Sequence, residues 1–247
     1  MFQVADAYDS FMGRYSKHLA PDFADFAGVS GTVVDVGCGP GALTGELVAR
    51  LGAERVAAAD PSEPFVAAVR ERLPGVDVRV APAEALPFED GVFDGALAQL
   101  VVHFMSDPVA GVREMARVTR PGGVVAACVW DMKNAPLTPF WRAARELDPD
   151  AQGEGQRPGT REGHLAEIFG DAGVADVEST ALAVRVEHET FEEWWKPFEL
   201  GVGPVGAYFT KLDEEGREAL RRKANESLGD GPVSIGSQAW AVRGVAK

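Results

Sequence analysis

The stretch Val33-Val-Asp-Val-Gly-Cys-Gly-Pro-Gly41 decides how the rest of this chain is organised. Its β-branched start predicts a buried strand that stops at Gly37. Residues 42–51 then carry apolar side chains at helical spacing. In such a strand, glycine turn and helix, the backbone can approach a ligand closely because glycine has no Cβ. The alternative is a tight turn that binds nothing, but three alternating glycines are more than such a turn needs.

The glycine spacing alone leaves the ligand open. The pattern G-x-G-x-x-A that begins at Gly37 also matches dinucleotide-binding proteins. Two features argue against NAD. Asp35 stands two residues before the first glycine, where a carboxylate can reach a cationic ligand, and Pro40-Gly41 shapes a wider turn than a pyrophosphate needs.

The same stretch resembles the first motif of the class I S-adenosylmethionine (SAM)-dependent methyltransferases, [DE]-x-G-x-G-x-G. Asp35, Gly37, Gly39 and Gly41 stand where that motif requires them. The resemblance implies that Asp35 serves the methionine end of SAM and that the glycines lie against it. We expect Cys38 to be a small residue that fills the turn rather than a nucleophile.

Composition narrows the class of protein. The 247 residues suit one large α/β domain, or one domain with an insertion. The net charge of −14 repels phosphate backbones, so we expect no nucleic-acid partner. Two cysteines, no apolar run of signal length and no stretch as long as a membrane span predict a reduced, cytoplasmic protein without a membrane partner.

A second carboxylate is expected at the same end of the sheet. Residues 55–60 are apolar up to a final aspartate, which predicts a strand with Asp60 at its C-terminal end. Ligands bind at that end in open α/β folds, and a carboxylate there can accept both hydroxyls of a ribose, in NAD or in SAM. Asp60 could instead cap the next helix, but Ser62 is the better cap for a helix that starts at Glu63.

The connection at 81–94, after a third strand at 76–80, favours SAM. Its Leu-Pro-Phe sequence, acidic-Gly turn and Phe-Asp end resemble the methyltransferase segment that holds adenine. The resemblance implies that Ala83 and Glu84 contact the adenine base. A fourth strand at 93–98 then leads into residues 99–104. In the resembling family, this part of the chain runs past the transferred methyl group. His103 lies there, and the unperturbed pKa of a histidine suits a general base, although packing is the alternative and many methyltransferases work by positioning alone.

The N-terminal and C-terminal parts are expected to cover the site. Residues 8–16 resemble the leading segment of a small-molecule methyltransferase group, which folds over SAM; a plain helix packed on the sheet is the alternative. Within it, Arg14 could pair with the methionine carboxylate.

The Pro- and Gly-rich stretch 132–159 is interpreted as a substrate-covering insertion. The aromatic stretch 190–198 is either hydrophobic packing or a wall of the substrate pocket. An Arg-Pro-Gly-Gly turn at 120–123 should precede the fifth strand at 124–130.

We therefore predict an α/β fold with a doubly wound, mostly parallel, seven-stranded Rossmann-like sheet and a helical cap. The core should comprise 28–131, 160–189 and 206–247, and the cap 1–27, 132–159 and 190–205. The predicted function is methyl transfer from SAM to a small molecule. The rivals are an NAD(P)-dependent oxidoreductase and a SAM-binding protein without transfer activity. No Cys/His cluster has metal spacing.

The expected site residues fall into two groups. Those implied for the cofactor and its lid are Tyr8, Met12, Arg14, Tyr15, Ser16, Asp35, Gly37, Cys38, Gly39, Gly41, Asp60, Pro61, Ala83, Glu84, Ala85, Gln99 and Leu100. Those expected to face the substrate are His103, which is also the candidate catalytic residue, Phe104, Trp194, Trp195 and Phe198.

Overall fold

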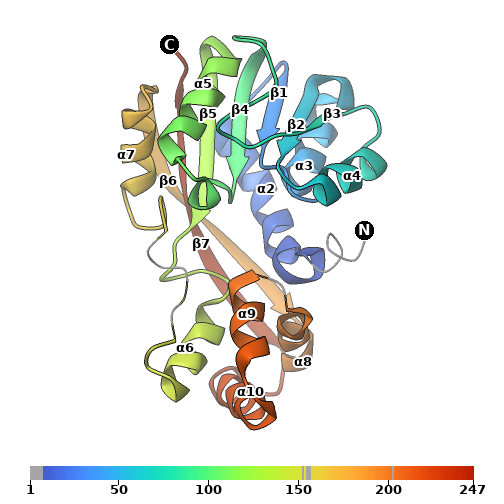
Figure 1. The fold of residues 1–247 in the computed structure, drawn as a ribbon, viewed down its shortest axis with the longest axis vertical. Coiled ribbons are helices and arrows are strands. Elements are labelled where there is room, and N and C mark those ends of the chain that lie inside the picture. Colours follow the sequence, from blue (N-terminus) through green and yellow to red (C-terminus); the bar gives the residue numbers. More distant parts are fainter. Residues whose placement is uncertain (1–7, 152, 154–156, 202) are drawn as a thin grey trace.

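A seven-stranded sheet with the strand order β3-β2-β1-β4-β5-β7-β6 forms the centre of the molecule (Figure 1). The computed structural model describes residues 8–151, 153, 157–201 and 203–247. Neighbouring strands from β3 to β5 pair in parallel, and β7 is antiparallel to both β5 and β6. The predicted fold class is therefore confirmed. The strands are β1 (Val33–Val36), β2 (Val56–Asp60), β3 (Asp77–Val80), β4 (Phe93–Gln99), β5 (Thr119–Trp130), β6 (Ala175–His188) and β7 (Val233–Val245).

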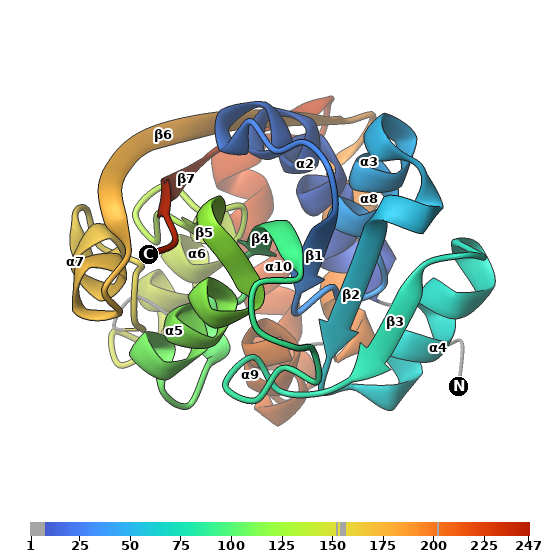
Figure 2. The same cartoon turned by 90° about the horizontal axis from the view of Figure 1, so that it is seen from above.

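Helices cover both faces of the sheet (Figure 2). Successive residues of a strand point to opposite faces. Val33 belongs to the core cluster that includes Leu19 and Leu43 from two of these helices, whereas Val34 belongs to the cluster that includes Met115. The elements around the sheet are η1 (Asp9–Gly13), α2 (Arg14–Ala27), α3 (Ala42–Leu51), η2 (Ala53–Arg55), α4 (Glu63–Arg72), η3 (Val102–Phe104), α5 (Pro108–Val118) and α7 (His164–Asp171).

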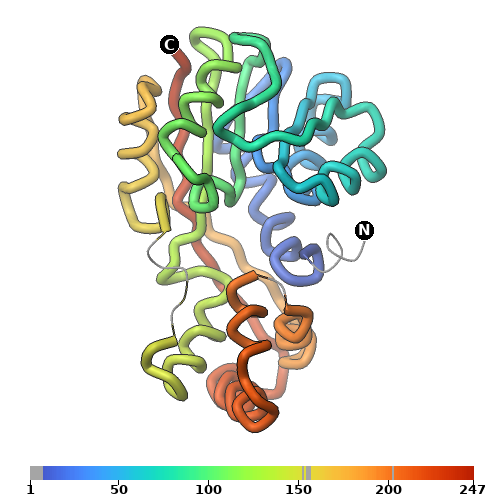
Figure 3. Tube along the Cα trace, in the orientation of Figure 1, coloured from blue at the N-terminus to red at the C-terminus, as the bar shows by residue number. Residues whose placement is uncertain are grey.

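The β6–β7 hairpin extends beyond the parallel strands and carries a second lobe (Figure 3). We call this lobe the cap; it consists of α6 (Thr138–Leu147), α8 (Phe191–Trp195), η4 (Lys196–Leu200), α9 (Gly203–Lys211) and α10 (Glu214–Leu228). Helix α10 contacts α6 and α8 and buries Leu220 and Ala224. Helices α9 and α10 thus lie in the cap, although the sequence placed 206–247 in the core.

Two local features differ from the expected pattern. Residues 120–123 do not precede β5 as a turn but lie within it, where the pairing with β4 shifts register between Phe93 and Gly95. Helix α9 was not expected at all, because its sequence is short and rich in glycine. Among the described residues, every helix is too short or too polar to cross a lipid bilayer.

Candidate active site

The glycine turn after β1 is fixed by its neighbour in the sheet. The backbone N–H groups of Gly37 and Cys38 both donate to the carbonyl oxygen of Ala59 on β2, at 2.7 and 3.1 Å. Gly37, Gly39 and Gly41 have φ angles of 72°, 52° and 98°, a left-handed region that side chains disfavour. The turn therefore has a defined shape before any ligand binds.

The three glycines are required for different reasons. A Cβ atom on Gly37 would lie 2.5 Å from the Val101 side chain, and one on Gly41 would lie 3.2 Å from Val69. A Cβ atom on Gly39 would meet no other atom within 4 Å. Packing explains Gly37 and Gly41, whereas Gly39 faces open space of the kind that a ligand in close contact with the backbone would fill.

Asp60 lies at the C-terminal end of β2 and holds this turn. Its Oδ2 atom accepts a hydrogen bond from the Gly39 N–H at 2.9 Å, and its Oδ1 atom accepts one from the Ser62 N–H at 2.8 Å. Burial raises the pKa of this carboxyl, which is only 7% exposed. The Ser62 side chain makes no capping hydrogen bond to α4, and Pro61 between the two residues is exposed. Asp60 is thus positioned beside the open space at Gly39.

Asp35 has a different environment from the one expected. Its side chain is 1% exposed, and its Oδ2 atom accepts a hydrogen bond from the Thr44 hydroxyl of α3 at 2.6 Å. Its Oδ1 atom has no hydrogen-bond partner among the described residues. Burial, with the nearby charge of Asp60, raises the pKa of Asp35 to about 7. The carboxylate lies beneath α3, so its expected contact with the methionine end of SAM stays a prediction.

The raised pKa of Asp35 predicts that this group lowers the free energy of unfolding as the pH rises. Between its ordinary value of 3.8 and about 7, the native protein holds a proton that the unfolded chain releases. Stability from this group therefore falls as pH rises through that window. We expect Asp35→Asn to unfold at higher urea concentration than the parent protein at pH 8, and the difference to vanish near pH 4. Asp22→Asn, on an exposed residue, is the control. An equal effect at both pH values would contradict the assignment.

The N-terminal segment reaches the glycine turn through α4. The Tyr8 ring packs edge-on against Phe65 at 5.6 Å. Arg72 donates to the Asp9 carboxylate at 2.7 Å and to the carbonyl oxygen of Pro40 at 3.1 Å. This one guanidinium therefore ties the N-terminal segment to the turn, in the position that a cover over the cofactor would need.

Other N-terminal residues contact the cap instead. The Arg14 guanidinium donates to the carbonyl oxygens of Glu193 and Trp194 at 3.0 and 2.9 Å. The Tyr15 hydroxyl lies 3.2 Å from Nε2 of His188, and burial raises the pKa of this tyrosine to about 12. The structure thus places Arg14 and Tyr15 in a buried contact between α2 and the cap, away from the glycine turn.

Ser16 and Gln99 connect α2 to the end of β4. The Gln99 side chain donates to the Ser16 carbonyl oxygen at 3.1 Å, and the Ser16 hydroxyl donates to the carbonyl oxygen of Met12. Leu100 follows with a φ of 63°, which is strained for a bulky side chain. Its N–H donates to the backbone carbonyl oxygen of Cys128 on β5 at 2.8 Å. The chain therefore turns sharply at Leu100, where β4 leaves the sheet.

A cavity of about 710 Å³ lies between the sheet and the cap. Its size suits a small-molecule ligand, and its wall is mostly apolar and aromatic. The described residues that line it are Tyr8, Phe11, Met12, Leu100, His103, Phe104, Trp130, Met132, Ala135, Pro136, Leu137, Thr138, Trp141, Arg145, Ala151, Gly153, Gly203 and Pro204. Leu100 and His103 connect this cavity to the glycine turn, because Val101 between them packs against Gly37.

His103 has the properties of a neutral imidazole. It is 5% exposed, its Nδ1 atom has no partner among the described residues, and its ring centroid lies 4.0 Å from that of Phe104. Burial, followed by the charge of Arg157, lowers the pKa of His103 to about 3. Phe104 is exposed, and the Arg157 guanidinium lies 4.8 Å from its ring centroid. His103 can therefore accept a hydrogen bond at neutral pH, but it binds a proton only weakly.

Comparison with known proteins gives a match for the part of the chain that forms the glycine turn and most of the parallel strands. Residues 34–127 match the methyltransferase domain family. The malonyl-[acyl-carrier protein] O-methyltransferase of Salmonella typhimurium is 37% identical over 113 residues, which are 45% of this chain and 44% of that protein. The match identifies residues 34–127 as a methyltransferase domain.

Solved structures with a similar fold cover nearly the whole chain, beyond the matched methyltransferase domain. A SAM-dependent methyltransferase from Thermotoga maritima is 19% identical, with a TM-score of 0.54 over 98% of this chain and 99% of that one. The [4+2]-cyclase SpnF is also 19% identical, with a TM-score of 0.55 over 93% of this chain and 81% of that one. The chain matches only 31 to 54% of the length of the first curated relatives, so similarity alone does not give its substrate.

The segment of the methyltransferase domain expected to hold adenine is bound to the loop before α5 by hydrogen bonds. Oε1 of Glu84 accepts hydrogen bonds from the N–H groups of Ser106 and Asp107, at 2.7 and 3.2 Å. Ala83 is buried and Ala85 is exposed. Glu84 thus holds the loop before α5, and adenine contacts from this segment stay a prediction.

The three aromatic residues expected as a substrate wall do not line the cavity. Trp194, Trp195 and Phe198 are at most 1% exposed and pack against one another inside the cap. Phe140 of α6 joins this cluster, with its ring centroid 5.0 Å from that of Phe198. This is the packing alternative that the helical spacing of the aromatic residues left open.

Five residues that were expected at the site line the cavity, namely Tyr8, Met12, Leu100, His103 and Phe104, and the rest of the wall comes from residues that the sequence did not single out. Trp130 ends β5, and Met12 lies in η1, where it was expected to cover the cofactor. Six wall residues lie within 132–141, in the stretch interpreted as a substrate-covering insertion. That stretch was the signal for the wall, but only the fold shows which of its side chains face the cavity.

Cys38 and metal-ligating side chains are the remaining groups that could take part in chemistry at this site. Cys38 is buried in the turn, and burial raises the pKa of its thiol, so the thiol stays protonated and is a poor nucleophile. Within the described ranges, no group of three His, Cys, Asp or Glu side chains is arranged to hold a metal ion.

Proposed function

We propose that this chain transfers a methyl group from SAM to a small molecule held in the cavity between the sheet and the cap. One observation supports the proposal most directly: two consecutive residues, Leu100 and Val101, link the cavity to the glycine turn. Val101 packs against Gly37 of the turn, and its neighbour Leu100 is part of the cavity wall. A cofactor on the turn would therefore lie at one end of the cavity.

The residues of the turn suit SAM. Gly39 offers open space next to backbone N–H groups, and Asp60 places a carboxylate at the end of β2, where the resemblance implies a ribose. SAM supplies, when bound, a methyl group on a positively charged sulfur that is a good leaving group. The protein must then align the acceptor and exclude water. Leu100 and the cap would provide that alignment, and neutral His103 could accept a hydrogen bond from an acceptor hydroxyl.

Neither rival has a comparable observation behind it. The family match favours a methyltransferase domain over an NAD(P)-dependent oxidoreductase. A SAM-binding protein without transfer activity would need a closed or missing acceptor site, whereas the cavity here has about 710 Å³. The fold by itself does not decide between these functions, because one similar structure is named for a cyclase.

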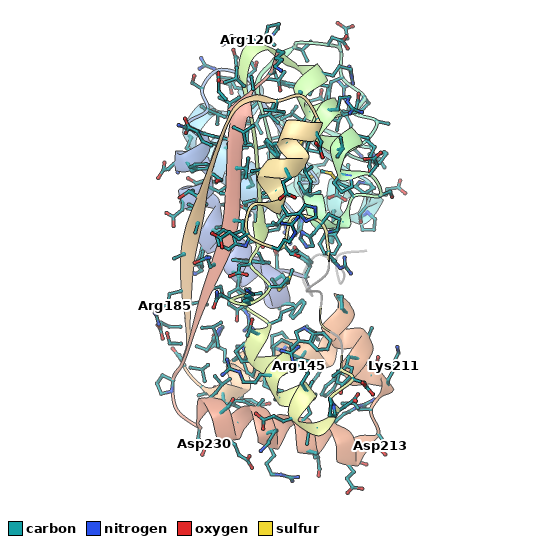
Figure 4. All side chains as sticks on the ribbon, turned by 90° about the vertical axis from the view of Figure 1, so that its left-hand side faces the viewer. Arg120, Arg145, Arg185, Lys211, Asp213 and Asp230 are labelled. Carbon is teal, nitrogen blue, oxygen red and sulfur yellow. The ribbon has the colours of Figure 1, made fainter. Side chains whose placement is uncertain are left out.

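A matched pair of glycine variants tests the proposal. We expect Gly39→Ala to weaken SAM binding at least tenfold, because a methyl group would occupy the space beside the backbone that a ligand needs, and tenfold corresponds to about 1.4 kcal/mol. Gly122→Ala is the control: Gly122 also has a positive φ and open space around its Cβ position, but lies in β5 beside Arg120, which Figure 4 labels at the end of the sheet far from the cap.

The readout is methyl transfer and SAM affinity together. Methyl-tritiated SAM would be incubated with phenols, hydroxylated aromatic acids and amines, and labelled product separated by chromatography. The parent protein and Gly122→Ala should form the same product, and Gly39→Ala should form less. SAM binding that is equally strong in both variants, or no labelled product from any acceptor class, would contradict the proposal.

A further inference from the structure

The cavity wall has an unusual charge balance for this chain. The sequence has 38 acidic and 24 basic residues, yet none of the described wall residues is acidic. Arg145 is the one formally charged side chain among them, since His103 is neutral. A cationic acceptor would lose its hydration in this cavity without gaining a counterion, whereas an anionic one would gain Arg145.

Helix α6 explains how Arg145 reaches the cavity. Thr138, Trp141 and Arg145 are spaced by three and four residues, so they form one stripe along the helix, and all three line the cavity. Arg145 is exposed and makes no hydrogen bond or ion pair with any described residue (its place on α6 is labelled in Figure 4). Arg142 is also exposed, but it does not line the cavity.

Two further wall residues have unpaired polar atoms. Nε1 of Trp130 and Oγ1 of Thr138 are buried and have no hydrogen-bond partner among the described residues. Leaving such groups unpaired is costly, and a ligand with oxygen atoms could satisfy them after small side-chain movements. The wall therefore combines aromatic surface with polar groups that lack partners in the protein.

We propose that the methyl acceptor is a flat aromatic acid whose carboxylate binds Arg145 in the cap. This inference rests on the proposed function and names the substrate class of the same cavity. The aromatic body would lie against Trp141 and Trp130, and the end opposite the carboxylate would face Leu100 and His103, next to the glycine turn. Arg145 then selects and orients the acceptor, and it takes no part in the transfer itself.

A pair of fluorescent probes tests this proposal without SAM or turnover. 1-Anilinonaphthalene-8-sulfonate is an aromatic monoanion, and N-phenyl-1-naphthylamine has the same ring system without the anionic group. Arg145→Met keeps an unbranched side chain but removes the charge, and Arg142→Met is the matched control on the same helix. Thermal melting of each variant, which should be unchanged for exposed residues, establishes that the fold is intact.

We expect the parent protein to bind the sulfonate more tightly than the neutral probe. Arg145→Met should weaken sulfonate binding about five- to tenfold, as for one lost charge-assisted contact, and leave the neutral probe unaffected. Arg142→Met should change neither. Equal weakening of both probes, no weakening of the sulfonate, or no preference for it in the parent protein would overturn the proposal. Methyl transfer from labelled SAM is measured separately, so failure of the proposed function would be recognised on its own.

Discussion

Asp60→Ala is expected to weaken SAM binding about a hundredfold, which corresponds to about 2.7 kcal/mol. The substitution removes the acceptor for the Gly39 N–H and for the Ser62 N–H, so the turn loses two of the contacts that define its shape. It also removes the carboxylate that the resemblance assigns to the ribose. Isothermal titration calorimetry with SAM measures the effect directly.

Two companion variants separate these contributions. Asp60→Asn keeps one acceptor oxygen and should lose less affinity than the alanine variant. Asp77→Ala removes an exposed aspartate from the neighbouring strand β3 and should bind SAM like the parent protein. Unchanged affinity in Asp60→Ala, with a normal melting temperature, would show that SAM does not lie against this turn.

Trp195→Ala is expected to lower the free energy of unfolding by about 3–5 kcal/mol, because it removes a large side chain from a closed core. Trp195 is fully buried, its ring stacks on Phe191 at 5.7 Å, and its Nε1 donates to Glu199 at 3.2 Å. Urea denaturation followed by circular dichroism measures the loss.

The control for this variant lies five residues further along the chain. Leu200→Ala affects an apolar side chain that is 53% exposed, and it should change stability by no more than about 0.5 kcal/mol. A stable Trp195→Ala variant that had lost binding of aromatic probes would contradict the packing role and support the pocket wall that the sequence left open.

Local sequence patterns predicted the βα unit well. The helix after the glycine turn spans Ala42–Leu51, as expected, because its apolar spacing and the glycines before it act over a few residues. Asp35 was harder to place. Because it lies two residues after Val33 on β1, its side chain points to the same face of the sheet as Val33, toward α3, where the Thr44 hydroxyl binds it, rather than toward the open end of the turn.

The cavity depends on contacts that no local pattern contains. Aromatic residues at helical spacing predict that Trp194 and Phe198 are buried, but not that Phe140, more than fifty residues earlier, completes their cluster. The wall brings η1 together with the end of β5 and α6, which follow it by more than one hundred residues in the sequence. Trp130 and Trp141 line the same cavity in a fold where α6 packs against α10 in the cap, and the β6–β7 hairpin carries that cap.

Calorimetric titration of the unmodified protein with SAM, and in parallel with NAD⁺, tests the adenosyl-sulfonium site most directly. The structure predicts saturable binding of SAM at one site per chain, with no heat from NAD⁺ at the same concentrations. Binding of NAD⁺ in the absence of any SAM binding would contradict the account and leave only the fold.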